Sequence, residues 1–176
     1  MMIKPRFNLA IRSARQLLQR AGVTHAPVNV EQLARLIGAT VRYSPLEGGI
    51  SGTAIRRSTG EVIIGVNSNH VRERQRFSLA HELGHAVLHR DAEFHLDDGV
   101  VIGFRSDQSS KADDPREIEA NQFAAELLMP AEFVIRDFHR LHHREVDDAI
   151  TELANLYGVS VQAMTIRVTK LTNVDL

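Results

Sequence analysis

The segment His81-Glu82-Leu83-Gly84-His85 carries two imidazoles and a carboxylate at a spacing that suits metal chemistry. Residues four apart on an α-helix lie about 40° apart around its axis and one turn along it, so His81 and His85 project from one face. Glu82 lies about 100° from His81, where it can reach a water molecule on the metal without being a ligand. In this H-E-x-x-H pattern the histidines bind zinc and the glutamate is the general base of a peptidase.

A chain with nine histidines can contain this pattern by chance, and the alternative is a helix with two solvated histidines and a surface glutamate. Its position in mid-helix, after a strand hairpin, favours the metal site. The chain has no cysteine, so disulfides, thiolate ligands and a cysteine nucleophile are excluded. Histidine and carboxylate ligands remain; we expect Zn²⁺, although Mn²⁺ also suits such a site.

A catalytic zinc needs a third protein ligand and an open fourth position. Glu117 and Glu119, at the start of the next long helical segment, are the candidates. Glu117 and Asn121 share a helix face, which permits Glu117 to bind the metal while Asn121 fixes a ligating histidine through its other ring nitrogen. Glu119 points about 200° away from Glu117, so both cannot face the metal. Both acids could instead complement the helix dipole.

Other histidines of the chain are alternative candidates for the third metal ligand. His89 lies one turn beyond His85, and three histidines on one helix would strain a tetrahedral site, so we expect His89 to pack or to support a ligand. His95 lies in a polar stretch and could swing in. The side chains that could assist at the reacting carbonyl are not distinguished by the sequence: Tyr157, Arg105, His139, His142 and His143. For the last three a solvated polar face is the preferred interpretation.

Hydrophobic periodicity and turn residues predict the elements that position these groups. Helices are expected over residues 7–22, 30–38, 71–89, 115–130, 130–141, 146–157 and 160–171. Strands are expected over residues 40–43, 52–56 and 61–67, the last two as an antiparallel hairpin. Residues 91–115 are expected to form a long polar loop. The fold class is therefore α+β, with a small antiparallel sheet of about three strands packed among helices.

The composition limits the partners. Lys and Arg total 21 against 22 Asp and Glu, for a net charge of −1, so no overall charge favours nucleic acid or an anionic membrane. No stretch approaches the roughly 18 apolar residues that span a bilayer. The basic, amphipathic beginning of the chain lacks the apolar core and cleavage site of a signal peptide. We expect a soluble, cytoplasmic protein that contacts no membrane.

Two segments in this order, RERQRFSLAHELGHAVLH at residues 72–89 and EIEANQFAAELLMP at residues 117–130, closely resemble the ImmA/IrrE family of metallopeptidases. The sequences ISG at 50–52, IIGVN at 63–67 and GVSVQAMTIRVTKL at 158–171 fit the same pattern. The resemblance covers most of the chain, weakly before about residue 28. It implies a zincin-like metallopeptidase domain over residues 1–144 and a helix-turn-helix-like helical tail over residues 145–176, packed on the same domain.

The resemblance also implies roles for single residues. His81 and His85 match the two histidine ligands and Glu82 the general base. The acidic ligand of the family stands four residues before the Asn of the ANQFAA-like stretch, which selects Glu117 over Glu119. In the expected mechanism the zinc carries a water molecule, and Glu82 takes its proton and passes it to the leaving amine. A substrate strand could add to the edge of the hairpin at residues 52–67.

Family members cut transcriptional repressors with high selectivity, and some are paired with a neighbouring antitoxin-like regulator. The resemblance therefore implies a zinc-dependent endopeptidase whose substrate is a helix-turn-helix repressor or antitoxin encoded nearby. The chain has little room for the additional sensor-like domain of the radiation-response members, so we do not expect that route of regulation here.

Two functions of other classes compete with this interpretation. Residues 152–171 resemble the second half of a DNA-binding helix-turn-helix, with Arg167 and Lys170 on the would-be recognition helix. The balanced charge argues against strong binding to nucleic acid. The other competitor is a non-catalytic, zinc-stabilised module that binds a regulator without cutting it.

Overall fold

The computed structural model describes residues 4–47, 49–89 and 114–172. The helices are α1 (Phe7–Arg20), α2 (Val30–Leu36), α3 (Arg72–Leu88), α4 (Pro115–Leu128), α5 (Ala131–Arg140), α6 (Val146–Tyr157) and α7 (Val161–Thr172), and the strands are β1 (Ala39–Ser44), β2 (Gly52–Arg56) and β3 (Val62–Asn67). Every expected helix and strand is present, which confirms the α+β class. The expected polar loop lies almost wholly outside the described residues.

The three strands form one sheet in the order β1-β3-β2. β2 and β3 pair antiparallel, with Gly52 opposite Val66, which confirms the expected hairpin. β1 pairs parallel with β3, with Ala39 opposite Val62. The sheet is therefore mixed, and the expectation of an antiparallel sheet is corrected for this one strand.

Asn67, at the end of β3, gives the physical reason for this order. Its side chain is buried and holds the connection between β1 and β2. The amide nitrogen donates to the carbonyls of Leu46 at 3.0 Å and Ile50 at 2.7 Å, and the amide oxygen accepts from the backbone N–H of Leu46 at 3.3 Å. This connection can therefore cross the end of β3 and leave β1 and β2 on opposite sides of it.

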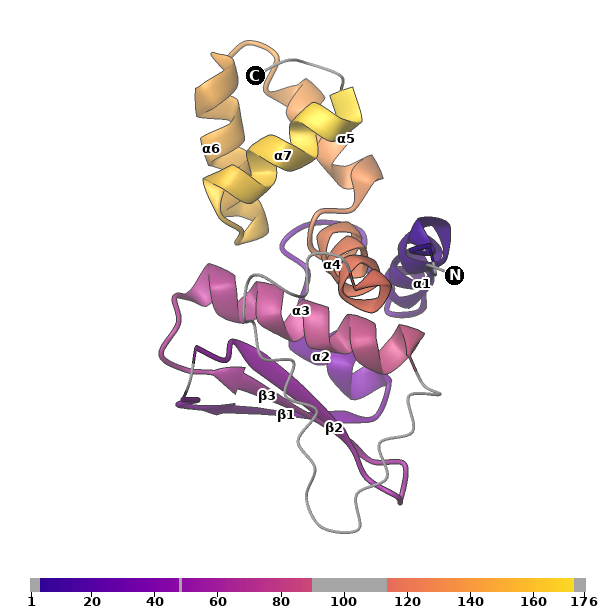
Figure 1. Cartoon of the computed structure of the whole chain (residues 1–176). Helices are drawn as coiled ribbons and strands as arrows, with labels where there is room; N and C mark the ends of the chain where they lie inside the picture. The colour runs from indigo at the N-terminus through magenta and orange to yellow at the C-terminus, as the bar shows by residue number, and fades with distance from the viewer. Residues whose placement is uncertain (1–3, 48, 90–113, 173–176) are drawn as a thin grey trace.

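Helices α2 and α3 cover one face of the sheet (Figure 1). Alternate residues of β3, namely Val62, Ile64 and Val66, are buried, as the period of two in a strand requires. On its other side α3 packs against α4, and α1 contacts both of these helices. Because α3 is enclosed by the sheet and by α4, polar side chains on it, including Glu82 and His85, are held inside the protein.

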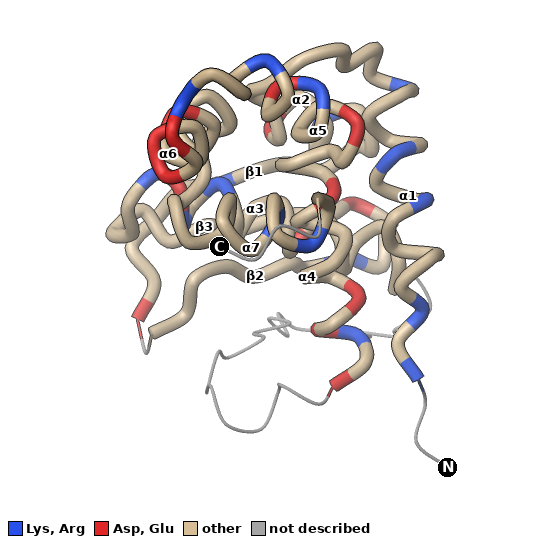
Figure 2. Tube along the Cα trace, turned by 90° about the horizontal axis from the view of Figure 1, so that it is seen from above, with Lys and Arg blue, Asp and Glu red and all other residues tan. Residues whose placement is uncertain are grey.

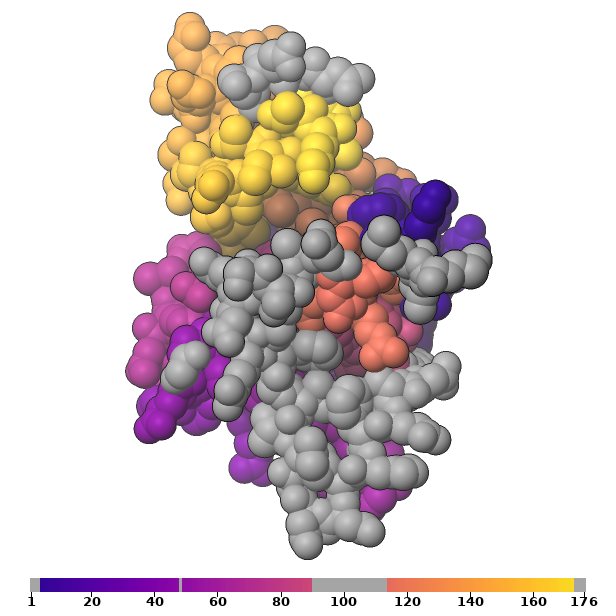
Figure 3. Space-filling model, in the orientation of Figure 1, coloured from indigo at the N-terminus to yellow at the C-terminus, as the bar shows by residue number. Residues whose placement is uncertain are grey.

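Helices α5, α6 and α7 pack on one another at the end of the molecule away from the sheet (Figures 1 and 3). α5 therefore groups with the last two helices, whereas the predicted boundary at residue 144 separates it from them. That division into residues 1–144 and 145–176 stays a prediction. Within the described ranges, no helix has both the length and the apolar character that a membrane span requires.

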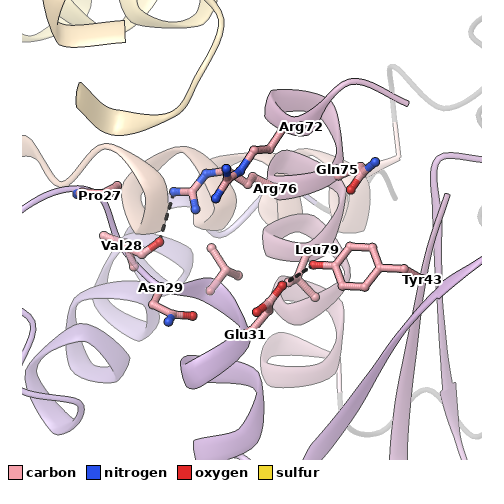
Figure 4. Close-up of a pocket in the computed structure, with 10 residues that line it drawn as sticks. Pro27, Val28, Asn29, Glu31, Tyr43, Arg72, Gln75, Arg76 and Leu79 are labelled. Carbon is pink, nitrogen blue, oxygen red and sulfur yellow. Dashed lines mark hydrogen bonds between the residues drawn. The ribbon is translucent and has the colours of Figure 1, made fainter. Parts of the chain in front are cut away.

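Arg76 of α3 ties this helical group to the sheet side of the protein. Its guanidinium donates to the carbonyls of Tyr157 at 3.2 Å, Gly158 at 3.1 Å and Val28 at 3.0 Å, beside a hollow of about 600 Å³ (Figure 4). Gly158 ends α6 in the left-handed conformation, at φ 63°. A Cβ there would also lie 3.0 Å from Arg76 Nε, so the conformation favours glycine and an added side chain would crowd the guanidinium.

A buried carboxylate joins α1, α4 and α7. Glu126 of α4 is 2% exposed and accepts from Arg15 Nε of α1 at 2.7 Å. Its second oxygen accepts from Arg167 of α7, whose guanidinium also donates to the carbonyl of Met129 at 2.9 Å. Arg167 is itself buried, so this pair is shielded from solvent screening.

Glu126→Ala is expected to lower the free energy of unfolding by about 3–5 kcal/mol, because it leaves the Arg167 guanidinium buried without its counter-charge. Urea denaturation followed by circular dichroism measures the loss. The matched control is Glu152→Ala, which removes an exposed pair with Arg144 at 3.1 Å and is expected to cost less than about 1 kcal/mol. Equal losses in the two variants would contradict the structural role of the buried pair.

Candidate metal centre

Three side chains that the sequence singled out come together between α3 and α4. His81 and His85 face one another from consecutive turns of α3, with their Nε2 atoms 3.0 Å apart. Glu117, in the first turn of α4, lies with Oε2 3.2 Å from His81 Nε2 and Oε1 3.4 Å from His85 Nε2. These three residues form a group that could hold a metal ion.

The spacing of the three donor atoms fits a tetrahedral zinc ion. Zinc bonds to nitrogen and oxygen of about 2.0–2.1 Å place neighbouring ligand atoms of a tetrahedron about 3.3 Å apart. The three observed separations are 3.0, 3.2 and 3.4 Å. Two imidazole nitrogens and a carboxylate therefore point toward one position at the distances that a shared cation requires.

Asn121 holds the first of the two histidines. Its Oδ1 lies 2.9 Å from Nδ1 of His81. An amide oxygen only accepts, so Nδ1 carries a proton, and in the neutral imidazole Nε2 then presents its lone pair toward Glu117 and His85. The structure thus gives Asn121 the contact that the sequence suggested for it, one helical turn after Glu117.

The close approach of α3 and α4 depends on Gly84, between the two histidines. A Cβ at Gly84 would lie 3.1 Å from Phe123 Cδ1 and 3.3 Å from both the Cα and the carbonyl oxygen of Ala120. These atoms belong to the part of α4 that follows Glu117. The glycine therefore sets the distance between the helix that carries two of the donors and the helix that carries the third.

Gly84→Ala is expected to lower the free energy of unfolding by about 1–3 kcal/mol, because the added methyl meets a packed ring and backbone atoms. It should also weaken metal binding by moving Glu117 away from the histidines. Thermal unfolding of the metal-free protein and a zinc competition titration measure the two effects. A variant with unchanged stability and unchanged zinc affinity would show that the helix spacing does not depend on Gly84.

Glu82 is buried beside the metal centre, with 3% of its surface exposed. It lies against Gly52 of the edge strand β2, where a Cβ would come within 3.0 Å of Glu82 Cγ and 3.2 Å of Oε1. The absence of a side chain at Gly52 thus leaves room for the Glu82 carboxylate. The sequence pattern contained this glycine, but the packing reason for it appears only in the structure.

The electrostatics of the group keep the carboxylate ionised. Burial by itself would raise the pKa of Glu117, but its close interactions with the imidazoles of His81 and His85 outweigh burial, and the pKa lies well below its usual range. Burial lowers the pKa of His85, which favours the neutral imidazole that a metal needs. Burial would also lower the pKa of His81, but Glu117 and the charge of Glu82 raise it overall.

Other residues considered from the sequence lie elsewhere. The Tyr157 hydroxyl is buried and donates to Asp137 Oδ2 at 2.8 Å, so it does not face the metal centre. The ring of His142 lies 3.0 Å from the His139 carbonyl and packs on that of His143, at the end of α5. The remaining two candidates lie outside the described residues: His95 and Arg105.

One of the two basic residues on which the DNA-binding alternative depends is not accessible to DNA. Arg167 is buried in the ion pair with Glu126 and cannot reach a DNA base. The first turn of α6 is acidic, with Asp147 and Asp148, as the red segments of this helix in Figure 2 show. Lys170 remains exposed on α7.

Comparison with known proteins adds two findings. The family model of the IrrE N-terminal-like domain, a peptidase family, matches residues 34–169, a range that contains the three converging side chains and Glu82. A relative from Bacillus phage phi105, named "Uncharacterized immunity region protein 2", is 33% identical over 102 residues, or 55% of this chain. The match spans 59% of the length of that relative.

Proposed function

The chain belongs to the ImmA/IrrE peptidase family, and we propose that it is a zinc-dependent endopeptidase that cleaves a transcriptional repressor or an antitoxin-like regulator. The observation that carries the proposal is the convergence of His81, His85 and Glu117 next to the buried carboxylate of Glu82. A structural zinc site uses four protein ligands, whereas three leave a position for water and substrate.

The role that we propose for each residue follows from the position of its side chain. His81, His85 and Glu117 would hold the zinc, and Asn121 would keep the first histidine in the required tautomer. When bound, zinc lowers the pKa of a water molecule and polarises the scissile carbonyl. The Glu82 carboxylate takes the proton of the attacking water and returns it to the nitrogen of the leaving amine.

The substrate would bind as an extended strand along β2. β2 is the outer strand in the order β1-β3-β2, which is the position at which a peptide strand can be added to a sheet. Gly52 lies on this strand and against Glu82, which brings the edge next to the proposed general base. A peptide paired with β2 would therefore carry its backbone carbonyls past the metal centre.

The proposed substrate class rests on the family and on the printed name of the phage relative, which refers to an immunity region. The family that the chain resembles cuts transcriptional repressors, so a repressor is the substrate class that we propose. A repressor substrate would place the enzyme in the cytoplasm. The absence of cysteine in the chain agrees with that compartment.

A cleavage assay tests the proposal. The zinc-loaded protein is mixed with candidate helix-turn-helix regulators, those encoded by adjacent genes first, and intact-protein mass spectrometry follows each mixture. Two fragments whose masses sum to that of the substrate plus one water are expected. Stable complex formation without fragments would contradict the proposal and identify a non-catalytic module that binds the regulator.

A further inference from the structure

The second histidine of the metal centre is held by a chain of three side chains that ends at the beginning of α1. His85 Nδ1 lies 3.1 Å from His89 Nδ1, and His89 Nε2 lies 3.1 Å from Glu119 Oε2. Glu119 in turn accepts from Arg6, through the backbone N–H at 2.8 Å and through Nε and Nη2 at 3.0 and 2.9 Å. Arg6 precedes the first turn of α1.

The proton positions along this chain follow from which atoms can donate. The Arg6 guanidinium only donates and the Glu119 carboxylate only accepts, so the proton between Glu119 and His89 sits on His89 Nε2. With that single proton on its ring, His89 has a lone pair at Nδ1, which can accept from His85 Nδ1–H at 3.1 Å. His85 is left with its lone pair at Nε2, the atom that faces His81 and Glu117.

The two central members of this series of side chains are shielded from solvent. The side chains of His89 and Glu119 are 7% and 3% exposed, whereas that of Arg6 is 55% exposed. Water therefore has little access to the two central groups, and hydrogen bonds in such surroundings hold their geometry more firmly than at the surface. The sequence suggested Glu119 as an alternative to Glu117 as a ligand. In the structure Glu119 instead contacts His89 and Arg6.

We propose that Arg6, Glu119 and His89 are positioning residues that fix His85 in the tautomer and orientation that bind the metal. The inference rests on the proposed metal site. The three residues would orient His85 in the same way that Asn121 orients His81. Arg6 lies at the beginning of α1, 113 residues before Glu119 in the sequence. The proposal therefore makes the metal affinity depend on the position of this end of α1. None of the three belongs to the group of His81, His85 and Glu117 that could hold the metal.

His89→Phe tests this role, because phenylalanine keeps a ring but cannot accept the His85 proton. Zinc affinity, measured in competition with a chromogenic chelator, is expected to fall about 10–100-fold. His89→Asn should restore most of the affinity, since its amide oxygen can lie near the position of Nδ1. His142→Phe, the same change at an exposed histidine, should leave zinc affinity unchanged.

A second readout separates positioning from packing. Long-range ¹H–¹⁵N correlation spectra of the metal-free wild type should show the His85 proton on Nδ1, and those of His89→Phe a mixture of tautomers. A folded His89→Phe protein with wild-type zinc affinity would overturn the inference. If His89→Phe does not fold, Glu119→Leu decides by the same titration, with a loss of about tenfold expected and an unchanged affinity contradicting the inference. Failure of the wild type to bind zinc would instead overturn the metal site itself.

Discussion

Replacing Glu82 by glutamine is expected to slow cleavage by about 10²–10⁴-fold, the usual contribution of a general base, while zinc stays bound. Glutamine has nearly the shape of glutamate, so it fits the space beside Gly52, but its amide cannot take a proton from water. Single-turnover cleavage of the proposed repressor substrate measures the rate, and elemental analysis of the purified variant measures zinc.

The matched control is Glu73→Gln, the same change on an exposed residue in the first turn of α3. It should cleave at the wild-type rate. If Glu82→Gln cleaves as fast as this control, Glu82 is not the base. If Glu82→Gln has lost its zinc, the side chain serves the metal site instead.

Replacing Glu117 by alanine is expected to weaken zinc binding strongly as well as to slow cleavage. Glu117 supplies the only carboxylate among the three converging residues and the only donor from α4. Its removal leaves two histidines from a single helix, and the zinc affinity should fall by more than the ~10–100-fold that changes around the ligands cost. The competition titration used for the His89 variants measures this loss.

Gln122→Ala is the control for that change, because Gln122 lies on the same helix and has no part in the metal group. It should retain wild-type affinity. A tightly bound zinc in Glu117→Ala would mean that another group completes the site. The assignment of Glu117 as the third ligand would then be wrong.

Helix geometry alone was sufficient to predict which side chains of α3 and α4 share a face. His81, His85, Glu117 and Asn121 lie on the expected faces because the spacing of four residues is a property of any α-helix. The structure adds that these faces meet, with 2.9 Å between Asn121 Oδ1 and His81 Nδ1. The role of the first three as ligands stays a prediction.

Contacts between distant segments could not be derived from local patterns. The parallel placement of β1 depends on the hydrogen bonds of Asn67 to a loop about 20 residues earlier, and neither hydrophobic periodicity nor turn chemistry encodes such a contact. The partnership of Arg6 with Glu119 is of the same kind. By contrast, Gly84 lies in mid-helix, where glycine is unfavourable relative to alanine, so its presence in the motif could have indicated a close helix approach.

The dependence of cleavage on zinc is the decisive measurement: cleavage of the proposed repressor substrate is followed with the same sample before chelation, after removal of zinc and after its return. Cleavage is expected to stop when zinc is removed and to resume when one equivalent is restored, and Glu82→Gln should stay about 10²–10⁴-fold slower in both zinc-loaded states. Cleavage that continues in the zinc-free protein, at the same site and rate, would contradict it.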